Sequence, residues 1–107
     1  MAEDRSRLMK YKLMYLPVAI GNIEAIKEHV SQENKAAAIK LVGEMKRLIS
    51  TLVEMPNKYP VYQDNPAYRF IPVGSYIIFY KVDDDKRMVK IHRILHAKMD
   101  LRKLLGQ

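Results

Sequence analysis

Hydrophobic positions along the chain change their spacing from two residues to three or four. From residue 10 to residue 16 the side chains alternate in character, with Tyr11, Leu13 and Tyr15 on one side. A period of two predicts a strand with one buried face. Pro17 ends this strand, because proline lacks the backbone donor of a sheet but suits the first turn of a helix.

Two helices follow, and their apolar residues recur at helical spacing. The first covers residues 17–32 and the second covers residues 35–55, with the stripes Ala19, Ile23, Ile26 and Val30, and Ala38, Leu41, Met45, Leu48 and Leu52. Asn34 is the expected N-cap of the second helix, and Pro56 is its expected end. The short polar joint between the two helices predicts an antiparallel helical hairpin.

The second half of the chain contains three runs rich in β-branched and aromatic residues, at 67–73, 76–82 and 88–96. Such runs are typical of strands. Pro72 predicts that the first of them lies at a sheet edge or carries a bulge. Tight turns at Gly74–Ser75 and at the three aspartates 83–85 predict a meander, and residues 100–105 suit a short terminal helix.

The order strand, helix, helix, strand, strand, strand predicts an α+β fold with two layers. In it, the helical hairpin packs on one face of an antiparallel four-stranded sheet, and the other face stays solvated. We expect one core in one domain. Residues 1–8 are polar and aperiodic, so we expect a flexible N-terminal arm there and a single domain over residues 9–107.

The composition adds a strong positive charge. Nineteen Lys and Arg residues oppose twelve Asp and Glu residues, which gives a net charge of +7 and a pI near 9.7. Such an excess on a small domain favours an acidic partner, although it also serves solubility. The chain has no Cys, which excludes disulfides and thiolate chemistry and suits the cytoplasm. No apolar run is long enough to span a membrane, and residues 1–13 lack the apolar stretch of a secretory signal, so we expect an intracellular protein.

Metal and cofactor chemistry find no support in the sequence. In a strand, His92 and His96 lie about 13 Å apart, which is too far for one ion to bridge. Asp83, Asp84 and Asp85 lack the ligand spacing of a calcium loop, so we expect a solvated turn. The four glycines match no phosphate loop or dinucleotide motif. We therefore expect no metal and no cofactor.

The last strand carries the most suggestive polar residues. Its alternation predicts that Lys90, His92 and His96 share one face, while Val89, Ile91 and Leu95 turn to the opposite layer. With Arg69 on a neighbouring strand and Lys58 in the preceding loop, these residues predict a basic surface able to bind phosphates or an acidic peptide. The alternative is an ordinary solvated sheet face.

The stretch from Arg69 to Asp100 combines several family features: an arginine, a Gly before an aromatic and aliphatic strand, an acidic turn, and the segment VKIHRILH followed by a trailing Asp. With the strand-end proline in YLPVAIGNIEAI and the helix exit LISTLVEMPNKYP, it resembles the RelE/ParE superfamily of type II toxin–antitoxin toxins. The resemblance covers residues 9–105, nearly the whole chain. It implies a growth-inhibiting toxin.

Two mechanisms occur in that superfamily. RelE-like members cleave mRNA on the ribosome, where a base, cations and an acid act around one phosphate. By resemblance, Arg69 would stabilise the phosphate with help from Lys58, His96 or His92 would transfer protons, and Tyr80 would stack on a base. The chain lacks the dense Lys/Arg set and the C-terminal Tyr of the best-known RelE toxins.

ParE-like members bind and poison DNA gyrase without cutting RNA. The closing segment ILHAKMDL resembles this branch, in which His96 and Asp100 are structural markers and Asp100 braces His96. The resemblance leans to this reading, with RelE-like cleavage as the alternative and an inactive antitoxin-binding module as a second alternative. Each implies an acidic antitoxin held in a toxin–antitoxin hetero-oligomer. The residues expected to bind target or antitoxin are Lys58, Tyr59, Tyr62, Arg69, Tyr80, Lys90 and Asp100.

Overall fold

The computed structural model describes residues 10–106, and the arm predicted for residues 1–8 lies outside them. The strands are β1 (Lys12–Tyr15), β2 (Arg69–Val73), β3 (Tyr76–Asp83) and β4 (Met88–His96). The helical segments are α2 (Pro17–Ser31), α3 (Lys35–Ser50), the 3-10 turn η1 (Thr51–Val53) and α4 (Leu101–Leu104). The predicted order and the α+β class are confirmed. The single-domain assignment of residues 9–107 stays a prediction.

The sheet is mixed, so the prediction of a wholly antiparallel sheet is wrong. Its strand order is β1-β4-β3-β2, and β1 runs parallel to β4. Helix α3 returns the chain to the start of β1, where the Tyr11 amide donates a hydrogen bond to the Val53 carbonyl at 2.9 Å. Residues 54–68 then cross to the opposite edge of the sheet, where β2 runs in the same direction as β1. The antiparallel meander then gives β4 that direction too. A parallel pair needs such a long crossover.

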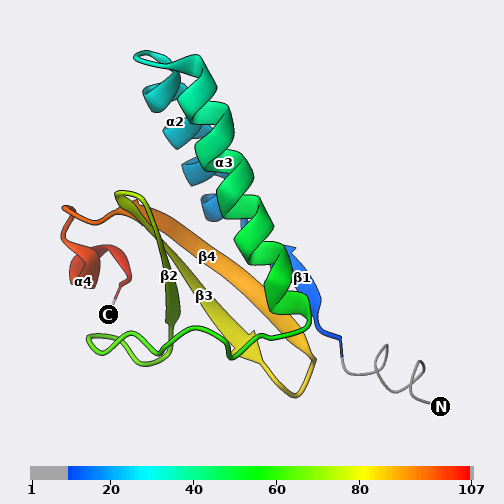
Figure 1. The fold of residues 1–107 in the computed structure, drawn as a ribbon. Helices are drawn as coiled ribbons and strands as arrows, with labels where there is room; N and C mark the ends of the chain where they lie inside the picture. The colour runs from blue at the N-terminus through cyan, green and yellow to red at the C-terminus, as the bar shows by residue number, and fades with distance from the viewer. Residues whose placement is uncertain (1–9, 107) are drawn as a thin grey trace.

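The helical hairpin covers one face of the sheet, which we call the hairpin face. Asn34 caps α3, because its side-chain oxygen accepts a hydrogen bond from the Ala37 amide at 3.0 Å. The α-helix ends at Ser50, earlier than predicted, and tightens into η1 before Pro56. In Figure 1 the two helices lie side by side and their connecting turn extends past the end of the sheet.

One extra residue in β4 interrupts its pairing with β3. Tyr80 pairs with Ile91, whereas Phe79 pairs with Arg93. His92 is therefore the additional residue of a β-bulge, which shifts the side-chain alternation by one position.

The predicted alternation of β4 holds before this bulge and fails after it. Ile94 belongs to the core on the hairpin face, whereas Leu95 belongs to a cluster on the opposite face. His96 packs edge-on against Tyr76, which contacts the hairpin-face core. The expectation that His96 shares a face with His92 is therefore wrong.

The opposite face, here called the outer face, has a small core of its own. Tyr68, Phe79, Leu95 and Leu105 are buried there, and α4 packs against them. Figure 1 shows α4 at one end of the sheet, away from the hairpin. The expectations of one core and of a solvated outer face are therefore wrong, because apolar residues of the C-terminal segment cover part of that face.

No helix within residues 10–106 combines the length and the apolar character that crossing a membrane requires.

Candidate functional site

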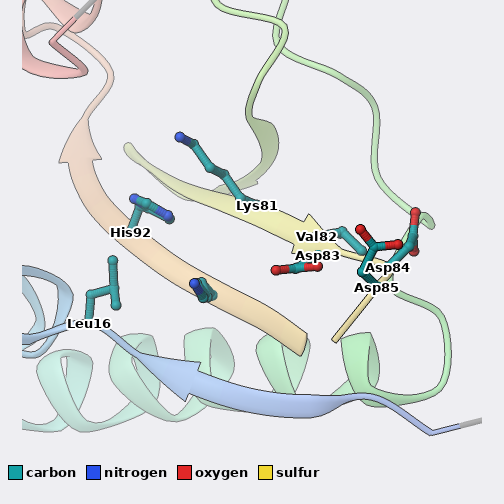
Figure 2. Close-up of a pocket in the computed structure, with 8 residues that line it drawn as sticks. Leu16, Lys81, Val82, Asp83, Asp84, Asp85 and His92 are labelled. Atoms are coloured by element: carbon teal, nitrogen blue, oxygen red, sulfur yellow. The ribbon is translucent and has the colours of Figure 1, made fainter. Parts of the chain in front are cut away.

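The uncovered part of the outer face holds a cavity of about 660 Å³ near the turn between β3 and β4. Strands β3 and β4 supply most of its wall, and Leu16 closes the side next to β1 (Figure 2). The residues around it are Leu16, Lys81, Val82, Asp83, Asp84, Asp85, Lys90 and His92. Its lysine and histidine side chains come from the strands, and its carboxylates come from the turn.

Burial and nearby positive charges both change the pKa of His92 at one end of this cavity. Burial lowers the pKa of His92 below its ordinary value. The positive charges of Lys81, Lys90 and Arg93 lower the same pKa further. The His92 ring lies edge-on to Tyr68, with ring centroids 5.3 Å apart, and the Lys81 ammonium lies 4.7 Å from the centre of that tyrosine ring.

Two of the carboxylates at the other end hold the turn together. Asp83 accepts a hydrogen bond from the Lys86 amide at 3.1 Å, and Asp84 accepts one from the Tyr11 hydroxyl at 2.6 Å. The latter bond joins the turn to the segment before β1 and is the main cause that raises the pKa of Tyr11. Asp83 and Asp84 therefore have structural roles, as expected of a turn.

Arg69 lies on the hairpin face, away from this cavity. Its guanidinium donates a hydrogen bond to the Tyr59 carbonyl at 2.6 Å, and the Tyr80 hydroxyl donates one to the Pro56 carbonyl at 2.8 Å. The Lys58 ammonium lies 5.6 Å from the centre of the Tyr59 ring. These contacts fix the loop after η1 against β2 and β3.

Tyr80 is completely buried in this cluster. Burial raises the pKa of Tyr80 to about 12. A ring without exposed surface cannot stack on a nucleotide base, so the structure gives Tyr80 a packing role.

The two remaining histidines line hollows on the hairpin face. His29, from the last turn of α2, and His96 both lie beside Tyr76 there. The Nδ1 atom of His96 accepts a hydrogen bond from the Lys98 amide at 3.1 Å. Asp100 instead caps α4 by accepting a hydrogen bond from the Lys103 amide at 3.4 Å, so the expectation that Asp100 braces His96 is wrong.

The predicted binding residues thus fall into separate groups. Lys90 lines the outer-face cavity, whereas Tyr62 packs edge-on against Phe70 and Phe79 in the outer-face core. Sequence reasoning missed Lys81. The signal was available, because a hairpin closed by the acidic turn pairs Lys81 with Lys90.

Metal binding finds no geometric basis in the described part of the chain. Across residues 10–106, no group of three His, Cys, Asp or Glu side chains is placed to hold a metal ion.

Solved structures share this fold at low sequence identity. The chromosomal ParDE toxin–antitoxin system from P. aeruginosa matches with a TM-score of 0.71 at 18% identity, covering 84% of this chain and 99% of that one. A mutant of the E. coli toxin RelE in the free state matches with a TM-score of 0.65 at 16% identity, covering 89% and 92%. The toxin–antitoxin complex RelBE2 from Mycobacterium tuberculosis matches with a TM-score of 0.54 at 18% identity, covering 83% and 94%.

These likenesses define the class, an α+β toxin fold found in both ParE and RelE proteins. Residues 13–101 match the family model of the ParE toxin of the type II toxin–antitoxin system parDE. The chain therefore belongs to the ParE toxin family, and it is a toxin of a type II toxin–antitoxin system. No curated protein matches its sequence. The resemblance to the RelE/ParE superfamily and the lean to its ParE branch are confirmed.

Proposed function

We propose that this toxin arrests growth by binding DNA gyrase and not by cutting mRNA. The observation that carries the proposal is the dispersal of Arg69, His92 and His96. Arg69 lies on the hairpin face against Tyr59, His92 lines the outer-face cavity, and His96 lies on the hairpin face beyond the bulge.

RNA cleavage by the attack of a 2′-hydroxyl needs a base, an acid and a cation around one phosphate. Productive contacts require these groups within about 3–3.5 Å of the reacting atoms. Positions four residues apart on a strand are already about 13 Å apart. Because His92 and His96 also project from opposite faces, one phosphate cannot contact both. Family membership and this geometry together favour a toxin that acts by binding.

We further propose an acidic antitoxin as partner. The net charge of +7 favours a negatively charged segment. The hairpin also exposes large apolar side chains, at Val18, Ile20 and Ile39, which an amphipathic helix would cover. The residues proposed to contact target or antitoxin remain Lys58, Tyr59, Tyr62, Arg69, Lys90 and Asp100. A gyrase target implies a cytoplasmic protein.

Controlled expression in a bacterium tests this proposal with two readouts. The proposal predicts gyrase-linked DNA breaks and an SOS response while mRNA stays intact. His96→Gln keeps a hydrogen-bond acceptor near the Lys98 amide and removes the proton-transfer group, so the DNA breaks should persist in this variant.

Ribosome-dependent mRNA cuts that disappear in His96→Gln would establish the RelE-like alternative. Growth that continues while a folded protein is expressed would support the second alternative, an inactive antitoxin-binding module. Thermal unfolding of the purified variant is the control, because a misfolded variant loses every activity.

A further inference from the structure

Lys81 and Lys90 face each other across the β3–β4 pair. They are directly paired residues, and both are half-buried in the wall of the outer-face cavity. Opposed side chains in such a pair have their Cβ atoms about 4.5–5.5 Å apart, and like charges there destabilise the sheet. Among residues 10–106, no carboxylate oxygen lies within 4.0 Å of either ammonium group.

His92 adds a third group to this pair. Its imidazole lies in the same wall and, like the lysines, is half-buried. Figure 2 shows Lys81 and His92 projecting from neighbouring strands, with Asp83, Asp84 and Asp85 gathered toward the turn. Asp83 and Asp84 accept hydrogen bonds from the Lys86 amide and the Tyr11 hydroxyl, so these two carboxylates are engaged at the turn and do not pair with the lysines.

We propose that Lys81, Lys90 and His92 form a binding site for a phosphate group. Lysine ammonium groups bind phosphate as point charges, and a protonated imidazole adds a charge-assisted hydrogen bond. An anion between Lys81 and Lys90 replaces their mutual repulsion with attraction to both. The cavity, about 660 Å³, lies within the usual range for small-ligand pockets.

The phosphate comes either from a free phosphate compound or from a DNA backbone, and both sources offer the same chemistry. This site does not depend on gyrase being the target, because binding is measured on the purified toxin alone. A failed gyrase experiment and a failed phosphate experiment are therefore distinguishable.

Nuclear magnetic resonance of the His92 imidazole during a pH titration tests the site. Inorganic phosphate and a short DNA duplex are added in separate arms, with chloride as the baseline. A bound phosphate stabilises the protonated ring, so the pKa of His92 should rise. Binding in the phosphate arm alone assigns the site to small phosphate compounds, and binding in both arms extends it to DNA.

Substitutions give the site a second test. Lys81→Gln and Lys90→Gln should each weaken phosphate binding about tenfold or more, whereas Lys81→Arg should retain it. In the DNA arm each loss should lower the logarithmic salt dependence by about one. Asp83→Asn should strengthen binding, because it removes a negative charge from the cavity and keeps the oxygen that accepts from the Lys86 amide.

The matched control is Lys40→Gln, which removes the same charge from an exposed position on α3. It should leave phosphate binding unchanged. An unmoved pKa of His92, or an equal loss of affinity in Lys40→Gln and Lys81→Gln variants of native stability, would overturn the proposal. Binding of an acidic peptide without binding of phosphate would also overturn it.

Discussion

Asn22 of α2 supplies a hydrogen-bond partner to β4 where that strand extends beyond its neighbour β1. The pairing of β1 with β4 ends at Ile91, so the amide of Ile94 lies beyond the neighbouring strand. The side-chain oxygen of Asn22 accepts a hydrogen bond from this amide at 3.0 Å. Because Ile94 is only 2% exposed, Asn22→Ala leaves a buried donor without a partner.

The expected cost follows from two opposing effects. An unpaired buried donor costs about 1–3 kcal/mol. Alanine is a better helix former than asparagine, so its higher helix propensity stabilises α2 by roughly 0.6 kcal/mol. The free energy of unfolding should therefore fall by about 0.4–2.4 kcal/mol. The matched control is Asn57→Ala at an exposed loop position, which should change stability by less than about 0.5 kcal/mol.

Urea unfolding measures both variants, and hydrogen exchange reports on the Ile94 amide directly. The amide should exchange faster in Asn22→Ala than in the control, with no change in the dependence of stability on urea concentration. Equal stabilities for the two variants, with Ile94 still protected, would refute the assigned role of Asn22.

Four further variants test other contacts. The pKa of His92 in the folded protein lies below its ordinary value of 6.5. The unfolded state therefore binds the proton first, and stability falls as the pH drops below about 6.5. In urea unfolding at several pH values, His92→Gln should flatten this dependence. Gly74→Ala should cost about 1–2 kcal/mol, because Gly74 has φ +58°, whereas Gly43→Ala in α3 should gain about 0.5–1 kcal/mol in thermal unfolding. Tyr80→Phe should cost about 0.5–1.5 kcal/mol through the lost bond to the Pro56 carbonyl, and it should abolish the ionisation near pH 12 in an ultraviolet titration.

The elements themselves were predictable because their signals are local. Pro17 and Asn34 mark where α2 and α3 begin, and Pro72 correctly indicated an edge strand. The ends of β4 were predicted without error, because the acidic turn and the loss of apolar residues bound it on both sides. Such features depend only on residues within a few positions of one another.

The direction of β1 and the faces of β4 depend on distant contacts instead. No local pattern in β1 reveals that the chain returns along the sheet before β2. The bulge at His92 leaves the sequence pattern ambiguous, because Ile94 and Leu95 are both apolar and either one can face the hairpin. One added residue therefore moved His96 to the other face.

The candidate site was predicted only in part. Lys90 and His92 do lie together at the outer-face cavity, but Arg69 is held by the Tyr59 carbonyl on the hairpin face. Lys81 went unnoticed because a single lysine in an aromatic strand looks like an ordinary solvent-facing position. The two lysines face each other only when the register of the hairpin around the acidic turn is worked out, and the prediction did not take that step.

Parallel assays with one preparation of purified toxin test the central claim most directly. One reaction contains DNA gyrase and supercoiled DNA, and the other contains ribosomes translating a defined mRNA. Binding without cleavage predicts that gyrase stalls with broken DNA while the mRNA stays whole. Toxin-dependent cuts in the mRNA, with gyrase unaffected, would contradict it.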